Sequence, residues 1–141
     1  MTRRAPEHSL QVFVVNYLRY NGVFCFAVPN GGRRDAATGA MLKKEGALAG
    51  VSDLILLLED GETVFVELKD GDNNKQSATQ IVFEKKVKSL GFTYLLWKRP
   101  EDVIEFVKGL KIMKFRQRRG EVLQSFPTER LSTSDRKEDK I

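Results

Sequence analysis

The sequence predicts an α/β domain in which helices flank a mixed β-sheet, chiefly because of the order of its hydrophobic periods. Segments with the helical period of 3.6 residues alternate with short apolar runs, in the order helix, strand, strand, strand, helix, strand, helix. The chain has 141 residues, of which 41% are hydrophobic, so it has enough apolar material for one core. We therefore expect one domain over residues 1–110 and a flexible, charged tail over residues 111–141.

The N-terminal third should contain a helix and then a strand. Apolar residues recur on one helical face over residues 7–21. A short apolar run over residues 23–28 indicates a strand, which ends at the turn-forming cluster Pro29-Asn30-Gly31-Gly32. Residues 36–48 form either a broken helix or an ordered loop, because two glycines weaken the helical pattern.

A hairpin should form the centre of the sheet. Residues 51–58 form a strand that we expect to be central and covered on both faces, because residues 54–58 are apolar at every position. Residues 63–69 form its partner, with Gly61 supplying the positive φ of a three-residue turn. A helix over residues 76–90, a strand over residues 93–97, and a helix from Pro100 to about Gly109 complete the order.

The type of hairpin turn decides which side chains share a face. A three-residue turn pairs Leu58 with Glu62 and, counting back, places Asp53 opposite Glu67. Their Cβ atoms would then lie ~5 Å apart, with Lys69 on the same face. A two-residue turn would put the two acids on opposite faces, and a Glu-x-Lys pair on a strand is usually a solvated ion pair, so these alternatives remain open here.

Two acids held this close favour a particular chemistry. Their carboxylates repel each other, and a divalent cation bridging the oxygens relieves the repulsion. Mg²⁺ or Mn²⁺ suits an all-oxygen site. Phosphodiester hydrolysis uses such an ion together with a nearby cationic side chain, a role that Lys69 could take. Asp53 opens an otherwise apolar strand, where an unpaired charge is unfavourable, and this favours a site over a solvated pair.

Composition narrows the class of protein. The net charge of +5 and the sequence pI near 9.4 suit a polyanionic partner such as nucleic acid, although many basic domains bind none. The single cysteine, Cys25, allows no internal disulfide, fits a reducing cytoplasm and should be buried. With His8 as the single histidine, a histidine general base or a Cys/His zinc site is not expected. We also expect no membrane partner, since no apolar stretch resembles a signal peptide or spans a bilayer.

Several segments resemble a known group of enzymes. The runs Gly50-Val51-Ser52-Asp53-Leu54 and Val66-Glu67-Leu68-Lys69, followed by a helix bearing Gln80, look like the PD-(D/E)XK nuclease superfamily. Within it, Val28-Pro29-Asn30-Gly31-Gly32-Arg33, then Leu42-Lys43-Lys44-Glu45-Gly46 and Ala49-Gly50-Val51-Ser52-Asp53, are similar to the VRR-NUC family of virus-type replication-repair nucleases. The resemblance covers residues 7–107 and implies a restriction-endonuclease-like sheet. Ser52 stands where the family commonly has proline, which removes no ligand.

The resemblance assigns roles to these residues. It implies that Asp53, Glu67 and the carbonyl of Leu68 bind the metal, Mg²⁺ or Mn²⁺, and that Lys69 assists catalysis. It also adds Gln80 and Glu7 to the site.

Both added residues have an ordinary alternative. An acid such as Glu7 is favoured at a helix N-terminus by the dipole. Gln80 could be a polar residue of a first helical turn, although its place on the face of Phe83 and Val87 favours a buried partner.

Candidate phosphate contacts are the turn and basic residues Asn30, Gly31, Gly32, Arg33, Arg34, Lys43, Lys44 and Lys75. The backbone amides of the glycines could approach a phosphate or simply form a turn. Taken alone, each basic side chain is more often a solvated surface charge than a phosphate contact. The basic run over residues 111–119 is either a DNA-binding arm or a solubilising tail.

Together these features predict a divalent-metal-dependent DNA endonuclease without base specificity, since no recognition module is apparent. Stand-alone proteins that resemble this form tend to dimerise and cut branched DNA such as Holliday junctions, so we expect a homodimer in a bacterial or phage-infected cytoplasm, with no small-molecule cofactor. The alternatives are a flap-cutting or nicking enzyme of the same family, a catalytically silent DNA-binding module, and a structural protein that does not bind DNA.

Overall fold

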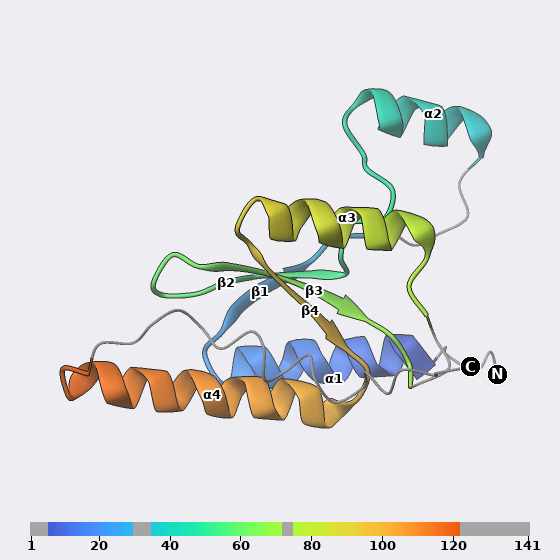
Figure 1. Cartoon of the computed structure of the whole chain (residues 1–141). Helices are drawn as coiled ribbons and strands as arrows, with labels where there is room; N and C mark the ends of the chain where they lie inside the picture. Colours follow the sequence, from blue (N-terminus) through green and yellow to red (C-terminus); the bar gives the residue numbers. More distant parts are fainter. Residues whose placement is uncertain (1–5, 30–34, 72–74, 122–141) are drawn as a thin grey trace, which may run out of the picture.

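The fold is a mixed sheet between helices, as the sequence predicts. The computed structural model describes residues 6–29, 35–71 and 75–121. Helices α1 and α4 lie on one face of the sheet and α3 on the other (Figure 1). The elements are α1 (Pro6–Tyr20), β1 (Phe24–Ala27), α2 (Ala36–Lys44), β2 (Leu54–Leu57), β3 (Thr63–Leu68), α3 (Ala78–Ser89), β4 (Thr93–Trp97) and α4 (Pro100–Arg118). The segment that could be a broken helix or a loop thus contains helix α2.

The sheet has the order β1-β2-β3-β4. β2 pairs antiparallel with both β1 and β3, whereas β3 and β4 run parallel because α3 crosses over between them. The register of the hairpin matches the prediction: Leu54 pairs with Val66, and the amide of Leu58 donates to the carbonyl of Glu62 over 2.9 Å. Gly61 has φ +86°, as a three-residue turn requires.

The hydrophobic core lies between the sheet and the pair α1 and α4. Alternate strand residues point into it, as the strand period of two demands. Its buried members include Leu10, Val14 and Leu18 of α1, Val103, Phe106 and Val107 of α4, and Leu54, Leu56, Val64, Val66, Leu68, Leu95 and Trp97 of the sheet. Cys25 is also buried there, as expected. This core fixes the strands whose ends carry the candidate site.

The opposite face of the sheet is covered only in part. On α3, Phe83 packs edge-on against Phe65 of β3 and Tyr94 of β4. Leu57 of β2 therefore remains 44% exposed and Phe24 of β1 65% exposed. The position of β2 inside the sheet confirms that it is central, but the expectation that both its faces are covered is wrong, because α3 packs over β3 and β4.

The last helix is longer than the sequence indicated. α4 continues through Gly109 to Arg118, so the expected end near Gly109 is wrong, and the first part of the expected tail is helical. The physical reason is that Leu110 and Met113 continue the core-facing stripe of α4. Lys114 also forms an ion pair with Glu59 of the hairpin turn, with 3.1 Å between Nζ and Oε1.

The rest of the expected tail, residues 122–141, lies outside the described residues. Whether the basic run of α4 is a DNA-binding arm stays a prediction. Among the described helices, none has the length and apolar character needed to cross a bilayer.

Candidate active site

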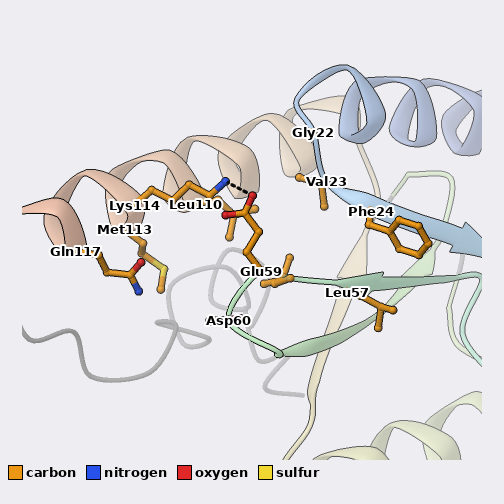
Figure 2. Close-up of a pocket in the computed structure, with 11 residues that line it drawn as sticks. Gly22, Val23, Phe24, Leu57, Glu59, Asp60, Leu110, Met113, Lys114 and Gln117 are labelled. Atoms are coloured by element: carbon orange, nitrogen blue, oxygen red, sulfur yellow. Dashed lines mark ion pairs between the residues drawn. The ribbon is translucent and has the colours of Figure 1, made fainter.

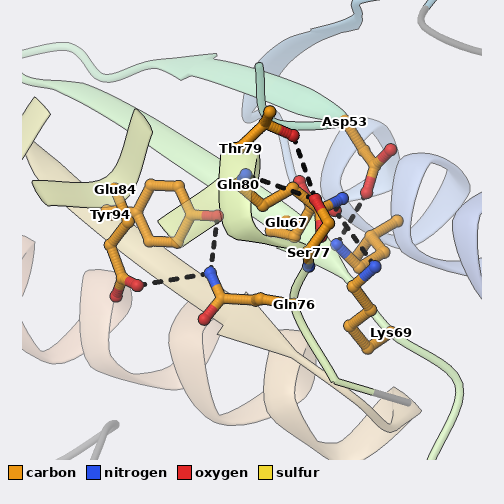
Figure 3. Close-up of polar contacts among 10 residues, drawn as sticks. Asp53, Glu67, Lys69, Gln76, Ser77, Thr79, Gln80, Glu84 and Tyr94 are labelled. Carbon is orange, nitrogen blue, oxygen red and sulfur yellow. Dashed lines mark hydrogen bonds and ion pairs between the residues drawn. The ribbon is translucent and has the colours of Figure 1, made fainter. Parts of the chain in front are cut away.

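Asp53 is held where three strands meet. It immediately precedes β2, and the register that pairs Leu54 with Val66 places it opposite Glu67 of β3. Its side-chain Oδ2 accepts a hydrogen bond of 2.8 Å from the amide of Leu68, and its carbonyl accepts one of 2.9 Å from the amide of Val28. The carboxylate therefore lies against the backbone of β3, beside the glutamate (Figure 3).

Glu67 is an acid almost without solvent contact. Only 1% of its surface is exposed. Its Oε1 accepts a hydrogen bond of 2.6 Å from Nε2 of Gln80, and Nζ of Lys69 lies 3.7 Å from the same oxygen. Its Oε2 is buried and has no hydrogen-bond partner among the described residues. Buried polar atoms nearly always have a partner, so this oxygen is available to coordinate a bound ion.

The electrostatics of this pair favour a cation. Burial, above all, and the negative charge of Asp53 raise the pKa of Glu67 to about 8, although the ammonium of Lys69 acts in the opposite direction. A carboxyl this unfavourable as an anion holds its proton at neutral pH unless positive charge is brought to it. The unpartnered oxygen and the adjacent carboxylate therefore fit a divalent metal ion.

The set of possible acidic ligands is small. Within residues 6–29, 35–71 and 75–121, no group of three or more histidine, cysteine, aspartate or glutamate side chains converges. An ion bound by Asp53 and Glu67 would therefore complete its coordination with backbone carbonyls, such as that of Leu68, and with water. Mg²⁺ and Mn²⁺ accept such oxygen ligands.

Gln80 combines both interpretations that the sequence left open. Its side-chain Oε1 accepts from the backbone amide of Ser77 over 2.8 Å, and its backbone amide donates to the hydroxyl of Ser77 over 3.3 Å; these two hydrogen bonds together cap the N-terminus of α3. Its Nε2 meanwhile donates to Glu67. The side chain is thus a helix cap and a neighbour of the acidic pair, and the expectation of a buried partner is confirmed.

The two remaining predicted site residues differ in their contacts. Lys69 follows β3 directly, its side chain is only 12% exposed, and it lies on the face of Glu67. Glu7 occupies the first turn of α1, and its side chain forms no ion pair or hydrogen bond with the described residues. Its negative charge nevertheless contributes to raising the pKa of Glu67, so the two acids are near each other.

Comparisons with known proteins show which solved structures have a similar fold. No family model matches the sequence, and no curated protein matches it either. A solved structure described as "VRR_NUC domain" is similar with a TM-score of 0.56 and 18% sequence identity, over 74% of this chain and 97% of that one. Another, described as "VRR_NUC domain protein", has a TM-score of 0.58 and 18% identity, over 73% of this chain and 85% of that one.

The chain has the VRR_NUC fold. This bears out, at the level of the fold, the likeness drawn from the motifs, and it bears out the α/β class with a mixed sheet. At 18% sequence identity, these similarities concern the fold that this chain shares with the two solved structures.

The predicted phosphate contacts are distributed around the VRR_NUC fold. Lys43 and Lys44 lie in the last turn of α2, Lys75 precedes α3, and all three are exposed. Asn30, Gly31, Gly32, Arg33 and Arg34 lie outside the described residues. The role of these residues in nucleic-acid binding stays a prediction.

The sequence interpretation missed a polar group beside Glu67. Tyr94 of β4 is buried, and its hydroxyl accepts a hydrogen bond of 3.2 Å from Nε2 of Gln76, which also donates to Glu84 over 3.2 Å (Figure 3). Burial raises the pKa of Tyr94, and the negative charge of Glu67 adds to the effect. The strand period of two could have revealed this neighbour, because Tyr94 pairs with Phe65, two residues before Glu67.

Gly50 is a second missed feature. It has φ +83°, and a Cβ there would collide with the carbonyl group of Thr79 and lie 2.7 Å from the amide of Gln80. The backbone that leads to Asp53 therefore touches the first turn of α3, and only glycine permits this approach. The contact links the two elements that carry Asp53 and Gln80.

A small pocket at the hairpin end of the sheet is separate from this site. It has a volume of about 170 Å³ and lies between the β2–β3 turn, the start of β1 and the end of α4 (Figure 2). The Lys114–Glu59 ion pair lies beside it, whereas none of the predicted catalytic residues lines it. The acidic pair lies at the other end of β2.

Proposed function

We propose that this protein is a divalent-metal-dependent endonuclease that hydrolyses the phosphodiester backbone of DNA. The observation that carries the proposal is the juxtaposition of Asp53 with the buried Glu67, whose free oxygen lies in a region of unfavourable negative charge. Lys69 places an ammonium 3.7 Å from the same glutamate. The VRR_NUC fold and the basic net charge of +5 support a polyanionic substrate.

Each residue has a distinct task in this proposal. Asp53, Glu67 and the carbonyl of Leu68 would hold Mg²⁺ or Mn²⁺, which supplies a nucleophilic water and polarises the phosphate. Lys69 orients the attacking water and stabilises the negative charge that develops on the phosphate oxygens. Gln80 holds Glu67 in its rotamer through the 2.6 Å hydrogen bond, so that the acid does not turn away from Asp53.

The substrate in this proposal is branched DNA, such as a Holliday junction, and the active form is a homodimer. Two symmetric incisions need two active sites, which a two-fold dimer supplies. The exposed Phe24 and Leu57 pair with each other on the uncovered part of the sheet, at exposures of 65% and 44%. Apolar residues gathered in this way supply a surface suited to a second copy.

The test compares wild type with Lys69→Ala on labelled four-way, flap and continuous duplex DNA, with and without Mg²⁺ or Mn²⁺. Lys85→Ala, an exposed lysine of α3, is the matched control for lost positive charge. Cleavage should require the metal and fall by about 10²-fold or more in Lys69→Ala, the size of effect seen when one charge-stabilising group is removed from an active site. Equal cleavage by the two variants would contradict the role of Lys69.

The products separate the remaining possibilities. Paired incisions across the junction support the branched-DNA endonuclease, whereas cuts confined to a flap or to one strand identify the flap-cutting or nicking alternative. DNA binding without any metal-dependent cleavage would indicate a catalytically silent binding module. Failure to bind DNA even at low salt would overturn the proposal as a whole.

A further inference from the structure

A large cleft lies directly beside Asp53 and Gln80. Its volume is about 750 Å³, and it lies between α2 with the loop that follows it and the first turn of α3. Asp53 and Gln80 are both part of its lining, so the cleft adjoins the acidic pair. Its volume falls within the ~300–1,000 Å³ that small-ligand sites commonly have.

One wall of the cleft is fixed in place. Gly50 packs against the backbone of Thr79 so closely that a methyl group would not fit. Ser77 and Thr79, at the start of α3, carry hydroxyls 3.1 Å apart that line this wall. The wall that contains the active-site residues is therefore preformed.

The other wall is independent of the hydrophobic core. α2 has no buried residue, and in the described part of the chain it packs against no other helix or strand. It stands away from the sheet, beyond α3 (Figure 1). An isolated helix of nine residues is only marginally stable in water. A ligand in the cleft would supply packing that α2 lacks within the monomer.

Apart from Lys43, the side chains that line the cleft are apolar or uncharged, except for Asp53, so the cleft suits the base and sugar of a nucleotide, while Lys43 could contact its phosphate. Ala47, Leu48 and Ala49 are exposed, apolar and small enough to leave the space open, and Leu48 is 62% exposed. A base or sugar can pack against them, while the hydroxyls of Ser77 and Thr79 can bond to its polar edge. A base pair stacked within a duplex cannot enter such a cleft, whereas a nucleotide outside the stack can.

We propose that this cleft is a nucleoside subsite, which takes an unpaired nucleotide next to the phosphate that is cut. The inference rests on the proposed function and gives it a physical basis for selecting branched DNA over continuous duplex. In a flap a nucleotide is already unpaired, and at the branch point of a junction a base pair opens more easily than within a continuous duplex, so a nucleotide enters at a lower free-energy cost.

The first experiment measures cleavage of two labelled duplexes that have the same sequence. One is fully paired, and the other carries a single unpaired nucleotide at the cut position. Wild type should cut the substrate with the unpaired nucleotide with a kcat/KM about ten-fold higher or more, because it avoids unpairing. Ala47→Phe fills the cleft and should abolish this preference through a raised KM. Ala40→Phe is the matched control, because Ala40 is exposed on α2 but does not line the cleft.

The second experiment measures binding without cleavage, with 2-aminopurine as the unpaired base and Ca²⁺ in place of Mg²⁺. Wild type and Ala40→Phe should change the fluorescence of the base, and Ala47→Phe should not. Equal cutting of both duplexes, or identical behaviour of the two phenylalanine variants, overturns the subsite and leaves the nuclease function standing. If wild type binds the 2-aminopurine duplex as predicted but cuts nothing in Mg²⁺ or Mn²⁺, the nuclease function fails and the subsite survives.

Discussion

The substitution Glu67→Gln should stabilise the metal-free protein at alkaline pH. Glutamine has the same shape as the protonated glutamate and can still accept the hydrogen bond from Gln80. It removes an ionisable group that burial and the negative charge of Asp53 make unfavourable as an anion. The effect should therefore depend on pH and be absent where wild type is itself protonated at this position.

The sign and size of the effect follow from the pKa. Burial and the negative charge of Asp53 raise the pKa of Glu67 from 4.5 to about 8, so between these values the folded chain holds a proton that the unfolded chain has released. The free energy of unfolding of wild type should therefore fall as pH rises through this window and level off above it. The full displacement corresponds to about 5 kcal/mol. Because Glu67 and Asp53 titrate as a pair and the structure around them can relax, we expect a smaller gain, on the order of 2–4 kcal/mol, for Glu67→Gln at pH values above the window.

Urea unfolding in EDTA at both ends of the window measures this difference. Wild type should lose stability between mildly acid and alkaline pH, while Glu67→Gln should lose much less. Glu105→Gln is a matched control, because this exposed acid forms only a surface ion pair with Lys108 and should change little at either pH. If Glu67→Gln and wild type respond to pH in the same way, Glu67 ionises normally and the electrostatic argument for the metal site fails.

Three further predictions concern the metal, the loop before β2 and the assembly. Mg²⁺ or Mn²⁺ should raise the melting temperature of wild type, measured by differential scanning fluorimetry, and should raise it more at pH 8.5 than at pH 6. The melting temperature of Asp53→Asn should not rise. Equal shifts for wild type and Asp53→Asn would place the ion elsewhere. Gly50→Ala should lower the free energy of unfolding, measured in urea, by at least ~2 kcal/mol, because the added methyl group meets the backbone of Thr79 and φ at this position is +83°. A variant as stable as wild type would contradict the close approach. Phe24→Asp should shift the protein from dimer to monomer in analytical ultracentrifugation without unfolding it, and an unchanged mass would remove this surface from the proposed interface.

The hairpin and its register could be predicted because local rules determine them. Gly61 selects the turn, the turn sets the pairing, and the strand period of two then places Asp53, Glu67 and Lys69 on one face. Each step uses only neighbouring residues. A buried partner for Gln80, which the structure identifies as Glu67, could also be predicted, because the helical stripe that carries Gln80 faces the sheet.

Features that depend on distant contacts could not be predicted in this way. The apolar run of β2 indicated cover on both faces, but the placement of α3 over β3 and β4 left Leu57 exposed. The basic run that follows Gly109 suggested a helix end there, yet Leu110 and Met113 pack on the core and the helix continues. The contact of Gly50 with Thr79 joins residues far apart in sequence, so no local pattern signals it.

The side-chain amide of Gln80 connects the start of α3 to Glu67 of the acidic pair. The oxygen of Gln80 belongs to the helix cap, and its nitrogen belongs to Glu67. Rotation or fraying of the first helical turn must therefore disturb the hydrogen bond to Glu67. In the same way, a ligand that reorients Glu67 must disturb the cap of the helix. Glutamate at position 80 could keep the oxygen contact but has no N–H to donate when ionised, and asparagine is one methylene shorter, so neither substitute can reproduce both connections at once.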